Sequence, residues 1–493
     1  MAALLALLPI GLLLLCMAVL GWSAARSGLI SAVAAVVIAI LAFGYVPDMM
    51  SLAGPLLEAA FMTATILWIV FPALALYEVQ ARSSASERLG IWLASVSDKQ
   101  QVTVIILAWF FALLLEGAAG FGTPVALVAP MLVGFGFSPH RALVLALIGH
   151  AAGVSFGAVG TPILPLLSLR PVDAGQLALM IMLLHAALGW SLVLVVSLLA
   201  RRNKGDHDPT VVAIAALCFF LPALGLAWLT GPELPTLGGA LIGGVMFAAF
   251  AKGRRPANSA VAGPGTKEVM SAVLPYILIL VAITATRTVP TLTTLLQSIV
   301  LDWKLTDRFA GSVMPLYHPG TMLMLALAAT ATASRERRRV ILPSLIHAAQ
   351  RLPMVGVALV SVLLVSRILV HSGMIDVLAQ TAASIFGSAW PLAIPLVAAL
   401  GSFITGSATA SNILFGGFQL TAAEATQLPP LSALVGQGFG AAIGNIIAPH
   451  NIVAGAATVG LIGREGRVLK KTFPLCLVYA LAGGLLLLAW GQV

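Results

Sequence analysis

The chain is short of charge. Asp, Glu, Lys and Arg make up only 9% of its 493 residues, whereas soluble domains carry about 25%. Hydrophobic residues make up 60%, and apolar runs of about 20 residues, each long enough to cross a bilayer, recur throughout. This composition excludes a large soluble domain and predicts an all-α, polytopic membrane protein. The first run, 1–22, follows no basic segment and precedes no small-residue cleavage site, so we expect a retained span.

Cysteine and catalytic motifs are also scarce. The three cysteines, Cys16, Cys218 and Cys476, all lie in apolar runs, which argues against a disulfide framework or a metal site. The sequence contains no Walker A loop, no HExxH motif and no cluster of cysteine ligands. We therefore expect no metal and no cofactor, and neither an ATP-driven pump nor a membrane enzyme is supported.

The net charge of +9 raises the question of a nucleic-acid partner, but the distribution of the basic residues argues against one. Lys and Arg gather in short loops within 82–99, 201–204, 252–267, 335–339 and 464–471. This pattern is typical of cytoplasmic loops, because positive charge is retained inside. We expect the loops around Asp48, Glu233 and residues 302–308 to lie outside.

The order of apolar runs predicts about 12 crossings and two re-entrant hairpins. An N-terminal repeat (1–200) contains three spans, a hairpin at 101–136 and two spans; two linking spans follow (201–267). The C-terminal repeat (268–493) has the same order, with its hairpin at 391–424. The expected hairpin arms are 101–115, 124–136, 391–404 and 412–424. Because each half has an odd number of crossings, the second half must be inverted, as in many secondary transporters.

One glycine spacing occurs once in each half. Gly149, Gly153, Gly157 and Pro162 repeat the spacing of Gly436, Gly440, Gly444 and Pro449. Glycines four apart are common where membrane helices pack closely. The proline at a matching offset favours helices broken inside the membrane, where an interrupted backbone must line a cavity or be buried in protein. The expected breaks are at Gly117, Gly120, Gly122, Pro124, Gly157, Gly160, Pro162, Gly406, Gly444 and Pro449.

Five stretches carry a family resemblance. "LLLEGAAGFGTPVA", "GAVGTPI", "HSGM", "TGSATASNILFG" and "IVAGAATVGLIGRE" resemble the L-lactate permease family of bacterial plasma-membrane carriers. The resemblance implies a proton-coupled symporter for lactate and related 2-hydroxy monocarboxylates such as glycolate. The chain departs from that pattern at Ala408 (Asp in the family), at His450 (Gln) and at His150-Ala151 (Asn-Thr), which leaves the substrate and its coupling open.

Glu116 is the first candidate for proton coupling. An ionisable group at membrane depth is costly and usually functional. An ionised Glu116 would repel an incoming carboxylate, whereas a protonated one would not. The further candidates are Glu58 in the third span and the histidines of the two broken spans, His150 and His450; a lone membrane histidine is more often a helix-packing contact.

Short polar side chains near the tips and breaks are the candidates for substrate binding. Hydroxyl and amide groups can hydrogen-bond a carboxylate or a 2-hydroxyl, or can cap a helix. These candidates are Thr123, Thr161, Ser407, Thr409, Ser411, Asn412, Gln437, Asn445 and Asn451. Arg287 and Arg367 could pair with a carboxylate or extend to the membrane interface.

The leading hypothesis is a carrier of a small monocarboxylate anion together with a proton. Sodium coupling, another organic anion such as a sulfonate, and an anion channel or exporter stay as alternatives, because backbone carbonyls at broken helices can bind sodium. The sequence leaves the oligomeric state open.

Overall fold

The computed structural model describes residues 1–20, 22–46, 48–120, 122–201, 208–253, 265–306, 309–462 and 464–490. Over these residues it has 11 helices, or up to 12 counting a bent pair, that are long and apolar enough to cross a membrane. The prediction of an all-α, polytopic membrane protein is confirmed.

The first half begins with three helices, α1 (Ala2–Leu14), α2 (Ala24–Ala42) and α3 (Met49–Arg82), and the short α4 (Ala85–Ala94). The first hairpin consists of a continuous helical arm, α5 (Gln100–Val104), a π-helical segment (Ile105–Phe111) and α6 (Ala112–Ala118), and of a returning arm, α7 (Thr123–Gly134). The interrupted helix that follows comprises α8 (Pro139–Gly149), a 3-10 segment (Ala151–Phe156), α9 (Gly157–Gly160), a second 3-10 turn (Thr161–Ile163) and α10 (Leu164–Leu167). The remaining spans are α11 (Ala174–Ala200), α12 (Pro209–Thr230) and α13 (Pro235–Gly253).

The second half contains α14 (Thr266–Thr288), α15 (Pro290–Gln297), β1 (Leu301–Thr306), β2 (Phe309–Val313), α16 (Pro319–Ala333), α17 (Arg335–His371) and α18 (Met374–Phe386). Its hairpin is formed by α19 (Trp390–Thr405) and α20 (Ala408–Ala425). A second interrupted helix comprises α21 (Pro430–Gly444), a 3-10 turn (Asn445–Ile447) and α22 (Pro449–Thr458). The chain ends with α23 (Glu465–Trp490).

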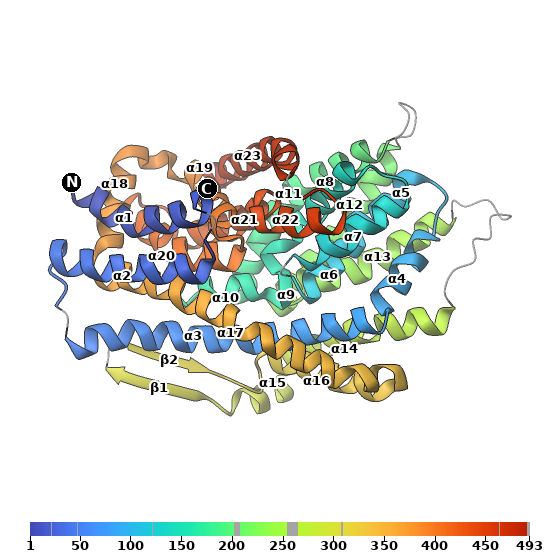
Figure 1. The fold of residues 1–493 in the computed structure, drawn as a ribbon, viewed down its shortest axis with the longest axis horizontal. Coiled ribbons are helices and arrows are strands. Elements are labelled where there is room, and N and C mark those ends of the chain that lie inside the picture. The colour runs from blue at the N-terminus through green and yellow to red at the C-terminus, as the bar shows by residue number, and fades with distance from the viewer. Residues whose placement is uncertain are drawn as a thin grey trace.

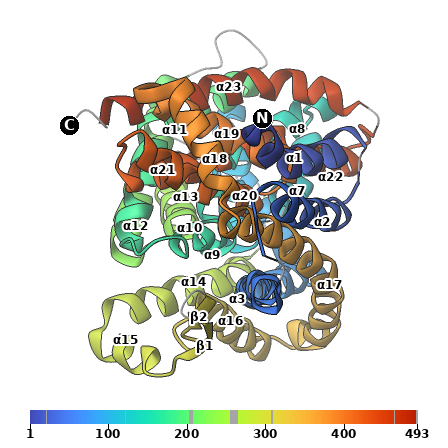
Figure 2. The same ribbon diagram turned by 90° about the vertical axis from the view of Figure 1, so that its left-hand side faces the viewer.

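The helices form two groups. One contains α3, α14, α15, α16, α17 and the strands, and lies below the hairpins and interrupted helices in Figure 2. Within it, α17 packs along α3 and also reaches α2 and α20. In Figure 1 the first hairpin lies to the right of centre and the second to the left, so the two approach the middle from opposite ends.

Two hairpin boundaries differ from expectation. The first arm runs from Gln100 to Ala118 and, with 19 residues, is itself long enough to cross a membrane. The returning arm of the second hairpin begins at Ala408 and not at 412. As a result, Ser407 is the residue before the first turn of α20, and the polar residues after it lie within that helix.

Five elements were not predicted. They are α4, α15, α18 and the antiparallel strand pair, in which Leu301 faces Val313. The strands cover the flank of α3, where the Trp303 ring lies 5.9 Å from that of Phe61. The strands were missed because a short alternation of polar and apolar residues is a weak signal beside long apolar runs.

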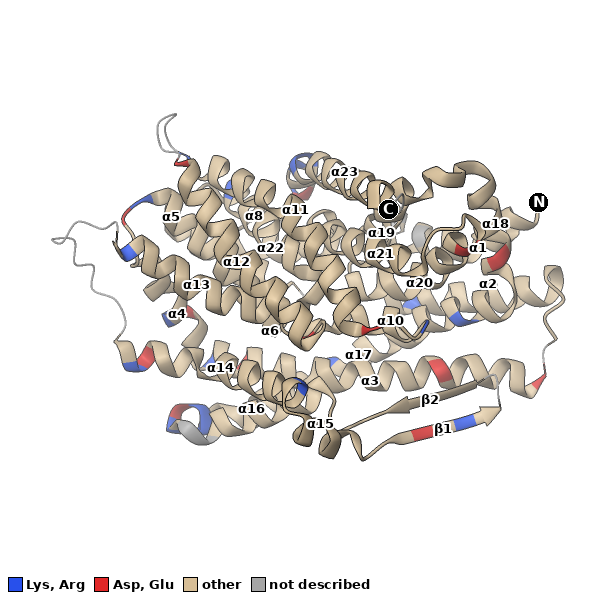
Figure 3. Cartoon of the chain, turned by 180° about the vertical axis from the view of Figure 1, so that it is seen from behind, with Lys and Arg blue, Asp and Glu red and all other residues tan. Residues whose placement is uncertain are grey.

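Lys and Arg gather towards the left-hand end of Figure 3, where α5, α13, α14 and α17 have their basic ends. Two charged residues that were expected in loops are nevertheless buried. Glu233, expected in an exposed loop, is 8% exposed, and Arg337 is 2% exposed. Arg337, which lies in the first turn of α17, donates to Gln80 and to the Ser271 carbonyl, so this basic residue stabilises the fold.

The expected orientation can be tested by cysteine labelling in a cysteine-free background. We predict that a thiol at Asp302, which is exposed, reacts with an impermeant reagent added to intact cells. A thiol at Arg339, also exposed, should react only after permeabilisation, because basic loops stay inside. Labelling of Arg339 but not Asp302 in intact cells would reverse the orientation.

Candidate functional site

Two Gly-Thr-Pro turns restart helices in the first half. Gly122 and Gly160 have positive φ, +76° and +80°, a conformation that glycine adopts without steric cost. Thr123 Oγ1 donates to the Gly120 carbonyl (2.8 Å), and Thr161 Oγ1 donates to the Ala158 carbonyl (2.6 Å). Pro then begins the helix. Both threonine hydroxyls therefore satisfy turn carbonyls, with their lone pairs left to accept further bonds.

The repeated glycines pack each interrupted helix against the first arm of its own hairpin. In the first half, a Cβ at Gly149, Gly153 or Gly157 would collide with Ala108, Leu113 or Glu116 respectively. In the second half, a Cβ at Gly436, Gly440 or Gly444 would collide with Ile394, Pro395 or Ala399. The glycines thus permit close helix packing, while the breaks follow immediately after them. Packing and breaking, which sequence reasoning set against each other, occur together.

Glu116 lies in the last turn of α6 at the first tip. Its side chain is buried, with 5% of the residue exposed. Oε1 lies directly against Gly157 of the first interrupted helix and beside Gly120. Within the described ranges, no hydrogen bond or ion pair reaches this carboxyl group. A buried carboxylate without a partner is strongly disfavoured, so this arrangement suits the protonated acid.

The second tip contains a buried network of amides and hydroxyls. Asn412 Nδ2 donates to the Pro162 carbonyl at the first break (2.7 Å). Gln437 Nε2 donates to Asn412 Oδ1 (3.1 Å) and to Ser411 Oγ (3.2 Å), and Ser411 Oγ donates to the Ala398 carbonyl. Ser407 Oγ accepts from the Ala410 N–H as a helix cap. Each of these four side chains therefore has a hydrogen-bond partner within the protein and helps to position the second tip.

Tips and breaks from both halves meet. Asn451 Oδ1, in the first turn of α22, faces Gly122 at the first tip. The His450 ring lies against Gly406 at the second tip. Val154 of the first interrupted helix packs against Ala408. The N-termini of α7, α20 and α22 thereby converge, and each carries the positive end of a helix dipole.

Some polar groups at this junction remain available. His450 is exposed, whereas Asn451 is 1% exposed and its Oδ1 has no partner among the described residues. Asn451 Nδ2 donates to Asn445 Oδ1. Thr409 is buried, and no described residue bonds its hydroxyl. His150 differs, because its Nδ1 donates to the Ala146 carbonyl (2.7 Å) within α8.

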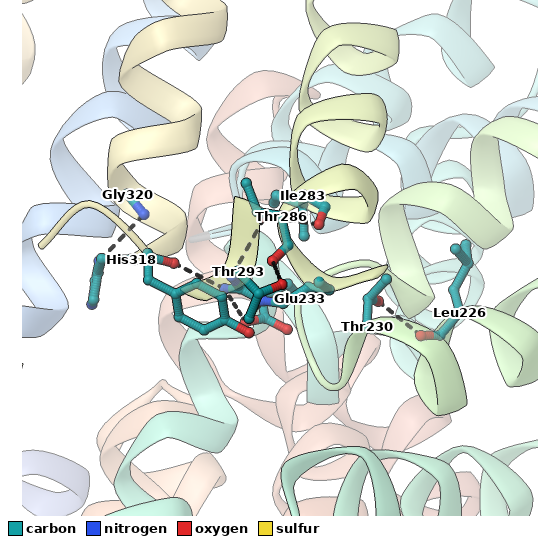
Figure 4. A network of polar contacts seen from close by, with 10 residues as sticks. Leu226, Thr230, Glu233, Ile283, Thr286, Thr293, His318 and Gly320 are labelled. Atoms are coloured by element: carbon teal, nitrogen blue, oxygen red, sulfur yellow. Dashed lines mark hydrogen bonds and ion pairs between the residues drawn. The ribbon is translucent and has the colours of Figure 1, made fainter. Parts of the chain in front are cut away.

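Arg287 is engaged elsewhere. Its guanidinium bonds Glu233 (2.8 Å) and the Tyr317 carbonyl (3.1 Å), and it lies over the Tyr317 ring. Figure 4 shows Glu233 between α13 and α14, beside Thr286 and Thr293. The backbone of Glu233 lies close to Gly160. The structure thus gives Arg287 a role in holding the α12–α13 loop against the first break.

Glu58 and Arg367 form a second charged group, on α3 and α17. His371 Nε2 lies 2.9 Å from Glu58 Oε2, and Arg367 Nε lies 3.9 Å from the same oxygen. The Phe309 ring of β2 lies 4.8 Å from the His371 ring. Unlike Glu116, Glu58 therefore has cationic or hydrogen-bonding partners in the protein.

A short hydrolase-like pattern, G-x-S-x-G, spans Gly153–Gly157, and sequence reasoning missed it. Ser155 is fully buried; its hydroxyl donates to the Gly438 carbonyl and lies 2.9 Å from His185 Nε2. The nucleophile of such hydrolases stands exposed on a strand-to-helix turn, whereas Ser155 lies in a 3-10 segment between helices. Ser155 therefore stabilises helix packing.

Comparisons with known proteins agree on one family. A sequence model of the L-lactate permease family matches residues 2–492. The chain is 30% identical to an L-lactate permease of Streptococcus iniae, covering 87% of this chain and 92% of that protein. It is 28% identical to a putative L-lactate permease of Haemophilus influenzae (89% of each chain) and 27% identical to the glycolate permease GlcA of Escherichia coli (100% and 96%).

Two solved transporters share a distant likeness. One is MtrF of Neisseria gonorrhoeae, described as illuminating a class of antimetabolite efflux pumps, at TM-score 0.48 and 14% identity over 89% of this chain and 84% of that one. The other is YdaH of Alcanivorax borkumensis, at TM-score 0.45 and 13% identity over 90% and 89%.

The network at the second tip yields a stability prediction. Asn412→Ala removes the bond to Pro162 and leaves a buried carbonyl and Gln437 under-bonded. We expect a loss of about 1–3 kcal/mol in the free energy of unfolding, seen as a lower melting temperature. Thr409→Val, in the same helical turn, should change the melting temperature far less. If Asn412→Ala melts normally but binds substrate weakly, Asn412 is a substrate ligand and not a positioning residue.

Proposed function

The chain belongs to the L-lactate permease family, a multi-pass transporter of the bacterial plasma membrane, and we propose that it carries a small 2-hydroxy monocarboxylate in symport with a proton. The observation that carries this proposal is the buried, unpartnered carboxyl group of Glu116 at the first tip. It lies against Gly157 of the first interrupted helix, at the tip where Gly122 faces Asn451 of the second one.

The proposed location of the bound substrate rests on the convergent helix N-termini. A carboxylate placed between α7, α20 and α22 would face free N–H groups and the positive ends of three dipoles. The Thr409 hydroxyl, the Ser407 hydroxyl and the exposed His450 ring are the groups nearest these termini that retain bonding capacity. Asn445 and Asn451 line the same junction. A 2-hydroxyl group would give the donors and acceptors here a second point of contact.

The proposed coupling to a proton rests on an argument about charge. Moving one anion against an inside-negative potential of 100 mV costs about 2.3 kcal/mol. If Glu116 binds a proton before the anion enters, the proton and the anion cross together, and no net charge is moved. Protonation also removes the repulsion between Glu116 and the incoming carboxylate. The loaded and empty carriers are then the two states that cross easily, which is the condition for symport.

We further propose that the halves are inverted repeats. The equal placement of glycines, each set against the first arm of its own hairpin, supports it, as do hairpins that approach from opposite ends (Figure 1). Access would alternate when one group of helices rocks against the other around the central junction.

Proteoliposome uptake tests the function. Labelled lactate, glycolate, pyruvate and acetate should be offered while a pH gradient or a sodium gradient is imposed alone. We predict accumulation with an acidic exterior, with lactate and glycolate preferred over acetate because acetate lacks the 2-hydroxyl. Accumulation driven by sodium alone would favour the sodium-coupled alternative, and non-saturable flux would favour a channel.

Glu116→Gln tests the coupling. The amide mimics the protonated acid in shape, so substrate binding and exchange between two pools of substrate should persist. Accumulation driven by a pH gradient should be lost, and the exchange rate should no longer depend on pH. Glu58→Gln is the matched control, and it should still accumulate substrate. If Glu116→Gln concentrates substrate and Glu58→Gln does not, the proton is carried at Glu58.

A further inference from the structure

A basic cavity lies away from the tips, where the loop before α8 meets the start of α23. Its volume is about 610 Å3. The lining residues are Ser138, Pro139, His140, Gly460, Leu461, Arg464, Arg467, Lys470 and Lys471. The cavity therefore joins a segment of the N-terminal half to one of the C-terminal half, and transport as proposed assigns it no task.

The described lining of the cavity contains four basic side chains and no carboxylate. Arg464, Arg467, Lys470 and Lys471 are exposed, and no carboxylate among the described residues pairs with them. His140 Nε2 is buried without a partner in the described part of the chain. The Ser138 side chain makes no cap bond at the start of α8. Such a set of groups suits an anion.

The geometry suits a phosphate group. Arginine forks match the oxygens of a phosphate, and lysine adds point charge. Both α8 and α23 begin at the cavity, and helix N-termini favour anions through their free N–H groups. These features apply equally to the phosphate of a soluble molecule and to that of a lipid headgroup.

The exposed surface of α23 favours the lipid headgroup over the soluble molecule as the source of the phosphate. Phe473, Leu477, Leu481 and Leu485 are exposed and lie four residues apart, forming one apolar stripe. Lys470 precedes Phe473 by three residues and so lies on the same helix face. The stripe thus begins at the cavity and leads away from it, as acyl chains would below a headgroup. In the expected orientation these loops face the cytoplasmic leaflet, which is rich in anionic lipid.

We propose that this cavity binds the phosphate of an anionic phospholipid, with its acyl chains along the exposed face of α23. The bound lipid would link the loop before α8 to the start of α23 and so join the two halves at one end. The proposal does not rest on the transported substrate or on the coupling ion.

The full-length protein, purified in neutral detergent, should be titrated with phosphatidylglycerol and with phosphatidylcholine of the same short acyl chains. We expect a saturable rise in melting temperature with phosphatidylglycerol only, and retention of one such lipid in native mass spectrometry. The double variant Arg467→Gln with Lys470→Gln should bind phosphatidylglycerol about 30-fold more weakly, since two cations near the anion are lost.

The matched control, Arg335→Gln with Arg339→Gln, removes two exposed charges outside the cavity and should bind as the unaltered protein does. His140→Leu, a milder change, should weaken binding without unfolding the loop. Equal binding of both lipids, or equal loss in the control variant, would overturn the site. Displacement of the lipid by inorganic phosphate at similar concentration would assign the cavity to a soluble phosphate compound instead.

Discussion

Interrupted backbone inside an apolar protein must find hydrogen-bond partners, and this constraint organises the centre of the molecule. Two helices and two hairpins break within 116–123, 149–164, 405–408 and 444–450. Unpaired peptide groups in an apolar surrounding cost several kcal/mol each. Side chains of neighbouring helices therefore supply partners at and beside the breaks: Asn412 of α20 bonds the carbonyl of Pro162, and Ser402 of α19 bonds that of Ala441 near the end of α21. Thr236 of α13 bonds Gly153 in the same way.

Among the described residues at these breaks, the Glu116 carboxyl group has no hydrogen-bond or ion-pair partner, unlike the side chains of Asn412 and Ser402. Glu116 is buried against Gly157, where a larger residue would displace its carboxyl group, and Gly120 lies in van der Waals contact with the same carboxyl. The same glycine contact that allows close packing therefore also places an acid against a break. Structure and proposed chemistry depend on one small set of glycines.

The helical, membrane-spanning character of the chain was readable from the sequence because the length of the apolar runs reports it directly. The prediction of an all-α protein with about 12 spans agrees with the 11, or up to 12, long apolar helices of the described residues. Contacts between charged residues far apart in the chain could not be predicted from the sequence. Arg287 and Glu233 are 54 residues apart in sequence, and Glu58 meets His371 across 313 residues; neither pair has a local signal. The strand pair was missed because its exposed, short segments lack the long apolar runs on which the sequence prediction depended.

The positions of the arginines bear on the proposed coupling. Arg287 is neutralised by Glu233 and Arg367 lies beside Glu58, so both of these candidate cations have acidic neighbours. A guanidinium fixed at the junction would hold a carboxylate firmly and neutralise it without a proton. Helix dipoles bind an anion more weakly, since each contributes typically 0.3–1 kcal/mol, and they leave its charge uncompensated for crossing. On the proposed mechanism, the acid and the helix ends therefore have complementary roles. The acid carries the proton that balances the charge of the anion, and the helix ends bind the anion weakly enough for it to be released.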